Sequence, residues 1–588
     1  MSRPSTSQLQ SRALVSVEEQ GTLKFAIKPL LSLGLFFNFM IILCLIFFAV
    51  AIAMKSQIHE AEYHFRPLEN LFRFEEVAVV TSEQQCNDLA RMLIVENFSV
   101  SVLAYAMQLC LFFTAPQRGG FGGSSTAVFV DAQAPNEDSS CHVIDPFEDY
   151  KISYIHDDPN KQFVGKCVYE KLYGTPFNSV ALPGEIITMM RFVNDSDGEE
   201  LAKLSHLLKV HNYTTYAISK SIAECNRIES PRLVISEELN WMFDPSDSFR
   251  PLDEGERYTI EIGEMGDGIA AGKSGFSDGS FIADTLPPLC IDNLTAKIVE
   301  YAEHMYKIEK ATGWRINGGR KFGNYRLCMP APYREALAKA DEETTHNEGD
   351  GEVTGRILTI TEILTKLCAN VKKMKGSMKQ HPSFKNYSNS GRLELNAEER
   401  KNEGPWQANM FVIISRKEKK AIAYSGTLGR FFGSKIQSGS FYFLNNILAE
   451  VKDENNKTDP FVRLLPAILY TKNEISLALA THGGSTRHSL SLPRTIYMLV
   501  LKQKFNVSIS ESAGYPLAFP STENFDLNNI IVMKDRVPYV ERLHRLYVVK
   551  DTKLNLPDEL VAIESVDGSL LAAHANHLGE DYNLPAGF

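Results

Sequence analysis

The segment NMFVIISRKEKKAIAYS, residues 409–425, carries the clearest structural signal in this 588-residue chain. Two apolar runs rich in β-branched and aromatic residues flank a charged turn, a pattern that predicts two antiparallel strands joined by a hairpin. The segment PAILYTKNEISLALATHGG, residues 466–484, repeats the pattern with Lys472-Asn473 at its turn. We therefore expect paired strands to dominate the last third of the chain.

The region before this hairpin is mainly helical in pattern. Helices are predicted where apolar residues recur at a spacing near 3.6, at 85–113, 199–227, 293–311 and 357–376. A further helix is predicted at 492–504, inside the strand-rich part. Helices early and strand pairs late indicate an α+β architecture with a layered sheet.

A long apolar run lies near the N-terminus. Residues 30–54, LLSLGLFFNFMIILCLIFFAVAIAM, contain no ionisable side chain. At a rise of about 1.5 Å per residue, such a helix crosses a hydrocarbon core of about 30 Å. The run is apolar on every face, whereas a surface helix would show a polar one, and a signal peptide would start earlier and end at a small-residue cleavage site. We expect a transmembrane anchor at 30–54.

The charges that flank this anchor predict its orientation. The tail at 1–29 carries four basic residues, namely Arg3, Arg12, Lys24 and Lys28. More Lys and Arg on this short side favour a cytosolic N-terminus. The sequence thus predicts a single-pass type II protein of the plasma membrane. A stalk at 55–74 would then lead to an extracellular or luminal ectodomain.

Two further features agree with an ectodomain outside the cytosol. Seven Asn-X-Ser/Thr glycosylation candidates follow the anchor, at Asn97, Asn194, Asn212, Asn293, Asn386, Asn456 and Asn506. Of nine cysteines, Cys44 lies in the apolar run and eight lie beyond it. An even number suits disulfides, although spacing leaves the pairing open. We interpret Cys110, within YAMQLCLFF, as a buried apolar cysteine.

Composition argues against several classes of ligand. The net charge of −11 does not favour nucleic acid as a partner. No CxxC or HxxxH spacing indicates a metal site, and no cofactor is expected. The segment GDGIAAGKS at 266–274 departs from a phosphate-binding loop, because Asp267 stands where its first glycine is required.

Several motifs, in order, resemble the γ-glutamyltransferase family, also called γ-glutamyl transpeptidase or glutathione hydrolase. The most specific is SVALPGEI at 179–186, close to the family's Ser-Val-Ala-Val-Pro-Gly-Glu-Ile. The resemblance runs from about residue 75 to residue 587. Its other motifs are GGFGGSS at 119–125, HVIDPFE at 142–148, DEGERYT at 253–259, LTAKIVEYA at 294–302, YRLCMPAP at 325–332, FFGSKIQSGSFYFLNN at 431–446 and THGGS at 481–485.

This resemblance implies a fold and a mechanism. The fold is the four-layer αββα sandwich of N-terminal-nucleophile hydrolases, here with a large-subunit-like region at 75–404 and a small-subunit-like region at 405–588. Family precursors cut themselves before a Thr, whose hydroxyl then attacks the γ-glutamyl amide of glutathione with its own α-amine as base. A paired-glycine segment holds the negative oxygen of the intermediate.

At the nucleophile this sequence departs from the family. The family's Asp-Gly-Gly-Thr-Ser-His-Val-Ser-Val falls on GPWQANMFV at 404–412. The nucleophile position is therefore Gln407, or Asn409 if the hairpin is aligned without a gap, and an amide cannot replace the hydroxyl. Thr427 is retained and is the best spare hydroxyl, although a structural role in a strand suits it better.

The substrate-binding positions are also altered. The arginine that clamps the substrate carboxylate falls on Phe147, and the Asn of Thr-Ile-Asn falls on Gly429. Of the acidic pair only Glu450 remains, and a Ser-Ser pair becomes Val462-Arg463. The paired glycines are kept at Gly483 and Gly484.

Two interpretations follow. The first is a catalytically inactive, uncut γ-glutamyltransferase-like membrane protein that binds a γ-glutamyl peptide such as glutathione, or a protein partner. The second is a glutathione hydrolase with an unconventional nucleophile.

Overall fold

The computed structural model divides the chain into two compact units, Met1–His64 and Phe65–Phe588. In the first unit it describes residues 38 and 40–48, which are helical. In the second it describes residues 71–135, 139–144, 184–210, 215–217, 243–244, 250–251, 257–259, 318–344, 353–378, 406–430, 433, 437–438, 442–447, 464–483, 489–521, 526–533, 547–552, 558–576 and 584–588.

None of the helices in these described ranges is both long and apolar enough to cross a membrane. Most of the anchor predicted at 30–54 lies outside the described residues, so that anchor stays a prediction.

Two antiparallel sheets form the centre of the second unit. In the six-stranded sheet the order is β22-β2-β11-β12-β3-β4. The hairpin predicted at 409–425 is confirmed as β11–β12, whose strands pair from Trp406↔Arg430 to Ser415↔Lys420. The strands of the six-stranded sheet are β22 (Ala586–Gly587), β2 (Val77–Thr81), β11 (Trp406–Ser415), β12 (Lys420–Arg430), β3 (Ser124–Asp131) and β4 (Cys141–Ile144).

The second sheet has seven strands, in the order β1-β21-β20-β16-β15-β10-β9. The predicted hairpin at 466–484 is confirmed here as β15–β16. The strands of the seven-stranded sheet are β1 (Phe72–Phe74), β21 (Ser569–Asn576), β20 (Asp558–Val566), β16 (Ile475–Gly483), β15 (Ala467–Tyr470), β10 (Tyr325–Cys328) and β9 (Arg320–Phe322).

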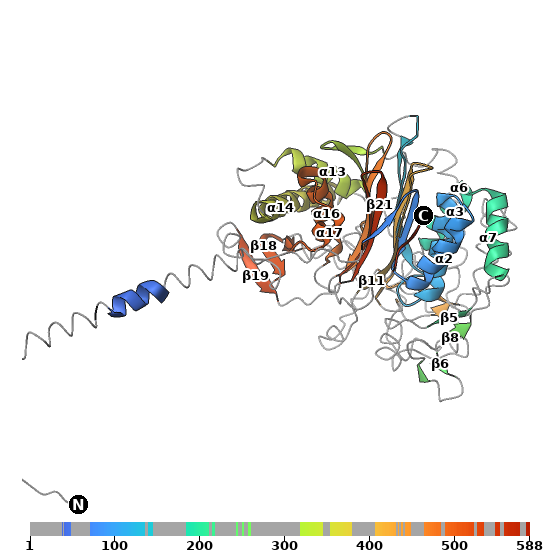
Figure 1. Ribbon diagram of the computed structural model, residues 1–588, viewed down its shortest axis with the longest axis horizontal. Coiled ribbons are helices and arrows are strands. Elements are labelled where there is room, and N and C mark those ends of the chain that lie inside the picture. The colour runs from blue at the N-terminus through green and yellow to red at the C-terminus, as the bar shows by residue number, and fades with distance from the viewer. Residues whose placement is uncertain are drawn as a thin grey trace, which may run out of the picture. The chain divides into compact units, whose positions relative to one another are not determined.

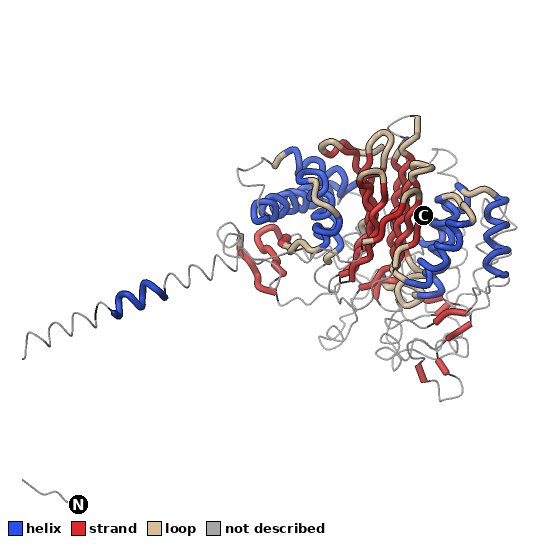
Figure 2. Tube along the Cα trace, in the orientation of Figure 1, coloured by secondary structure: helices blue, strands red, loops and turns tan. Residues whose placement is uncertain are grey.

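Helices cover the outer face of each sheet, so the layers run helix, sheet, sheet, helix (Figures 1 and 2). The six-stranded sheet is covered by α2 (Gln84–Val95), α3 (Val100–Thr114), α6 (Glu185–Asp195) and α7 (Gly198–Val210). The seven-stranded sheet is covered by α13 (Ala331–Glu342), α14 (Val353–Met378), α16 (Ser491–Phe505) and α17 (Ile509–Ala513). A small sheet of β17 (Ala518–Ser521), β18 (Asp526–Met533) and β19 (Val548–Thr552) lies beside them.

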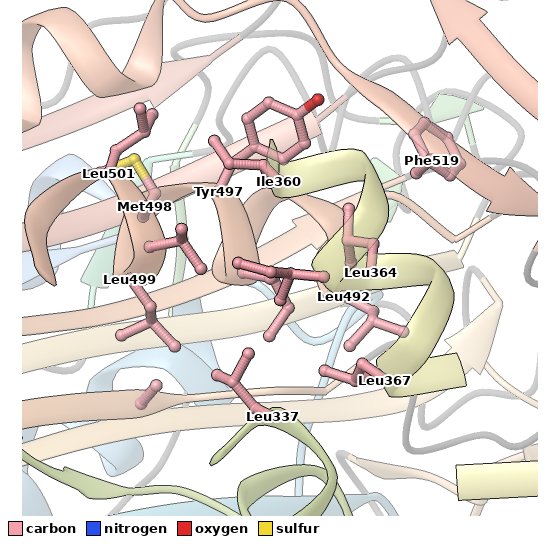
Figure 3. Close-up of a cluster of buried hydrophobic side chains, with 14 of the residues drawn as sticks. Leu337, Ile360, Leu364, Leu367, Leu492, Tyr497, Met498, Leu499, Leu501 and Phe519 are labelled. Carbon is pink, nitrogen blue, oxygen red and sulfur yellow. The ribbon is translucent and has the colours of Figure 1, made fainter. Parts of the chain in front are cut away.

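Three apolar layers hold these elements together. Along β11, Phe411 and Ile413 pack toward α3, whereas Val412 and Ile414 pack into the layer between the sheets. Successive side chains of a strand point to opposite faces, so a strand covered on both faces is apolar at every position. Figure 3 shows the third layer, where Leu364 of α14 lies near Leu492 of α16.

Two helix boundaries differ from the predictions. The segment 85–113 forms two helices, not one, because the chain turns at Asn97, whose φ is +58°, before α3 begins after Ser99. The helix predicted at 199–227 ends at Val210, and Thr215–Ala217 is the short strand β5, paired with β8 (Arg257–Thr259). The helices predicted at 357–376 and 492–504 lie within α14 and α16. The helix predicted at 293–311 lies outside the described residues.

The described cysteines of the second unit form two disulfides. Cys86–Cys110 joins α2 to α3, and Cys141–Cys328 joins β4 of one sheet to β10 of the other. Cys110 is buried, as interpreted from the sequence, but it forms a disulfide and is not a free apolar cysteine. Although α3 is buried along its whole length, its packing on α2 brings the two Cα atoms to 5.7 Å. Among the described cysteines, Cys44 and Cys368 are free.

Candidate functional site

The layer between the two sheets is apolar over most of its length and becomes charged at one end. On β20, Val561 and Ile563 face this layer, so Glu559 at the same alternation faces it too. The same alternation brings in His482 from β16 and His574 from β21. Together with Glu83 and Arg118 they form the group that we call the Arg118 cluster, whose five side chains are Glu83, Arg118, His482, Glu559 and His574.

Arg118 is the centre of this cluster. Its Nη1 lies 3.3 Å from Glu559 Oε2 and 3.6 Å from Glu83 Oε1, and all three side chains are at most 8% exposed. On the other side of Glu559, His574 Nε2 lies 2.9 Å from Oε1 and His482 Nε2 lies 3.7 Å from Oε2. Such charges are stable out of water only when they are paired, as they are here.

Glu559 stays ionised in this setting. Burial would raise the pKa of its carboxyl, but the charge of Arg118 and the hydrogen bond from His574 outweigh burial and lower the pKa to about 2. At neutral pH the cluster therefore holds a carboxylate with a guanidinium beside it.

Gln407, near the start of β11, contacts the cluster directly. Arg118 Nε donates to Gln407 Oε1 at 3.2 Å, and Gln407 is half-buried. The ladder shifts register between Gln407 and Asn409. The position that the resemblance assigns to the nucleophile thus carries an amide held by an arginine.

Asn409, the alternative position, has a different environment. Its Nδ2 donates to the carbonyls of Leu111 and Ala115, at 3.2 and 3.4 Å, in the last turn of α3. A Cβ on Gly119 would lie 2.7 Å from the same nitrogen, so glycine there leaves space for the amide. Of the two positions, Gln407 faces the Arg118 cluster and Asn409 caps a helix.

The hydroxyl of Thr427 is already committed. It donates to the carbonyl of Gln407, and it accepts from the backbone N–H of Gly429 at 2.8 Å. Thr427 is fully buried, and in the described structure none of its hydrogen-bond partners is a titratable side chain. A nucleophilic hydroxyl needs an adjacent base, so this geometry gives Thr427 a structural role.

Among the substrate-binding positions, the structure describes Gly429 and Gly483. Gly429 has φ of +97°, and a Cβ there would lie 2.1 Å from Asn446 Oδ1. Gly483 ends β16, where it pairs with Asp558 and its carbonyl accepts from Leu490 N at 3.0 Å. The remaining positions lie outside the described residues; they are Phe147, Glu450, Val462, Arg463 and Gly484.

The glycosylation candidates are described in part. Asn97 and Asn506 are exposed and adopt left-handed φ values of +58° and +48° at helix ends. Asn194 lies in the last turn of α6. The other four lie outside the described residues, namely Asn212, Asn293, Asn386 and Asn456.

Sequence reasoning did not find the Arg118 cluster. Its members lie before α2, after α3, on β16 and on the β20–β21 pair, so no sequence spacing links them. Within the described residues, no group of three His, Cys, Asp or Glu could hold a metal. One signal was available: Glu559 and His574 are ionisable residues on strand faces where the neighbouring alternate positions, Val561 and Ala572, are apolar.

Comparison with known proteins places this geometry in a fold. Neither a family model nor a curated protein matches the sequence. Cephalosporin acylase from Bacillus halodurans has a structure that covers 87% of this chain and 96% of its own, with a TM-score of 0.53 and 12% identity. A structure of LmbA2991 covers 89% of this chain and 100% of its own, with a TM-score of 0.52 and 12% identity. The chain has the fold of the N-terminal-nucleophile hydrolases.

At 12% identity, the similarity to these structures shows a shared fold and nothing more. The N-terminal-nucleophile fold is the one that the γ-glutamyltransferase resemblance implies, and its four layers agree with those in Figure 1.

Proposed function

We propose that this protein is a divergent γ-glutamyltransferase-like protein that is neither cut nor catalytically active and that acts by binding. One observation carries the proposal. At the strand start where the resemblance places the catalytic Thr, Gln407 presents an amide oxygen to Arg118. An amide has no nucleophilic hydroxyl, and its oxygen is already hydrogen-bonded.

The other parts of the reaction also lack support. The family's base is the α-amine that self-cleavage creates, which requires a chain end next to the nucleophile. A cut just before Gln407 would fall inside β11, next to the residue whose backbone pairs with Gly429. Removing a nucleophile alone leaves at best the residual catalysis that the rest of the site supplies. The best spare hydroxyl, Thr427, is hydrogen-bonded within the sheet.

The proposal includes a location and a class of partner. The apolar run at 30–54 would anchor the protein in the plasma membrane, with the folded unit outside the cytosol. The two disulfides support this location, because such bonds persist in oxidising compartments. The ligand would be a γ-glutamyl peptide such as glutathione, or a protein partner.

Denaturing gel electrophoresis of the purified, deglycosylated full chain tests the proposal. We expect one band at the full-length mass of 65.9 kDa and no release of aniline from a γ-glutamyl anilide. Two bands from a cut just before Gln407, together with turnover, would overturn the proposal and establish the alternative, a glutathione hydrolase with an unconventional nucleophile.

A further inference from the structure

Glu185, the first residue of α6, is a fully buried carboxyl that has no cationic partner among the residues that the structure describes. Its Oε2 accepts from Gln108 Nε2 at 3.0 Å and from the Tyr424 hydroxyl. Its Oε1 has no hydrogen-bond partner. Buried carboxylates are normally paired with a cation or fully hydrogen-bonded, and Glu185 is neither.

Within the described part of the chain, the elements packed around Glu185 bring no balancing charge. The polar side chains that act on it are Tyr424 of β12, Gln108 of α3 and Ser125 of β3, all neutral. Tyr424 stays neutral because burial raises its pKa well above the usual value, and the same holds for Tyr105 on α3.

The charges further along α6 are paired with each other. Arg191 Nε lies 2.7 Å from Asp195 Oδ2, and Lys420 acts on Asp195 rather than on Glu185.

Burial raises the pKa of Glu185 to about 7, although the hydrogen bonds from Tyr424 and Gln108 lower it. The proton of this carboxyl is therefore lost near neutral pH.

Glu185 lies against the glycine turn, which we define as residues 119–123. The backbone N–H groups of Gly184 and Glu185 donate to the carbonyl of Gly123, at 2.9 and 3.2 Å. A Cβ on Gly123 would lie 3.2 Å from Glu185 Cγ, and one on Gly426 would lie 2.1 Å from Oε1. The backbone around this carboxyl is so close that an ionised form gains solvation only if α6 moves.

The glycine turn follows directly after Arg118. The carbonyl of Arg118 accepts from Leu428 N at 2.7 Å. Leu428 lies between Thr427 and Gly429, and Gly429 pairs with Gln407. A movement of the turn would therefore reach the residue that holds Gln407. The first turn of α6 and the Arg118 cluster are linked through a few backbone hydrogen bonds.

We propose that Glu185 is a pH-sensitive latch that docks the first turn of α6 onto the glycine turn when protonated and releases it when ionised. Release frees the hydrogen bonds to the Gly123 carbonyl and loosens the segment that carries Arg118. The site is then tightest in an acidic compartment and loosens as the pH rises through neutrality. This device does not depend on whether the protein is an enzyme.

Hydrogen exchange of the full chain, followed by mass spectrometry, tests the latch. Exchange at pH 6 and pH 8 is compared for peptides covering 119–125 and 184–193, after correction for the intrinsic rates. We expect the opening of these peptides to increase about tenfold from pH 6 to pH 8 in the wild-type protein, because one proton is linked to opening. Glu185→Gln, which cannot ionise, should show no such increase.

Two further variants keep the test decisive. Tyr424→Phe removes a donor that lowers the pKa of Glu185, so its transition should move to higher pH. Glu564→Gln is the matched control, since Glu564 is equally buried but faces Lys502 Nζ at 2.6 Å. Glu564→Gln should show the same increase in opening from pH 6 to pH 8 as the wild-type protein in both peptides. The latch is overturned if opening in the wild-type protein does not depend on pH, or if Glu185→Gln keeps the wild-type ratio of opening at pH 8 to opening at pH 6. If Glu185→Gln does not fold, an unshifted transition in Tyr424→Phe overturns it.

Discussion

Single residues decide what chemistry this fold can perform, and at the start of β11 the residue is Gln407, an amide that Arg118 holds at 3.2 Å. A short motif that resembles the γ-glutamyltransferase family was enough to predict the nucleophile position at Gln407 or Asn409. The Arg118 cluster could not be predicted, since its charges meet only when β16, β20 and β21 fold against the loop after α3. Alignment also left Asn409 open, and only its hydrogen bonds to α3 distinguish it from Gln407.

Restoring the hydroxyl alone should not restore activity. We expect Gln407→Thr to remain a single chain and to release no aniline from a γ-glutamyl anilide, because Arg118 and its carboxylates still occupy the surroundings and no freed α-amine is present. Gel electrophoresis and the anilide assay measure both outcomes. A cut chain in this variant would show that the site is one substitution away from self-cleavage.

The buried ion pairs predict a large effect on stability. Arg118→Ala leaves Glu83 and Glu559 buried without their cation and should lower the free energy of unfolding by about 3–5 kcal/mol. Arg91→Ala is the control, because Arg91 pairs with Asp88 while 41% exposed and should cost no more than about 1 kcal/mol. Urea denaturation compares the two. Equal losses would contradict the assigned role of the cluster.

Stability should also depend on pH through Glu185. Its folded pKa of about 7 exceeds the unfolded value near 4.5, so its contribution is present at low pH and is lost as the pH rises through about 7. Glu185→Gln should therefore be more stable than the wild type at pH 8, with the gap growing by about 2–3 kcal/mol between pH 5 and pH 8. Thermal denaturation at the two pH values measures the gap, and a constant gap would contradict the shift.

At the scale of elements, patterns with strong periodicity were predictable and their ends were not. The hairpins β11–β12 and β15–β16 follow from alternating apolar runs with charged turns between them. The break between α2 and α3 was missed because apolar residues keep a helical spacing on both sides of it, and a single left-handed residue, Asn97, makes the turn. Disulfide partners were not predictable, because bonding depends on how elements pack.

The two disulfides should differ in their contribution. Cys141–Cys328 closes a loop of 187 residues and Cys86–Cys110 one of 24, so loop entropy predicts about 5 and about 3.5 kcal/mol respectively. Paired Cys→Ser substitutions at each bridge, compared by thermal denaturation, test the order. A larger loss at Cys86–Cys110 would show that helix packing outweighs loop closure.

At the scale of the whole molecule, the residues alone indicate an α+β layered sheet, and the four layers follow only from the family resemblance. Which helices cover which sheet depends on contacts between segments hundreds of residues apart, as where β2 pairs with β11. The layer between the sheets is apolar along most of its length and charged at one end. Neither composition nor periodicity predicts this contrast.

The placement of the bridges has a practical consequence. Both bonds lie on the N-terminal side of Trp406, and the sequence has no cysteine after Cys368. No covalent tether can therefore join the two halves that a cut before Gln407 would create. A nicked molecule would separate into fragments on a gel run without any reductant, so a lone full-length band can only be an intact polypeptide.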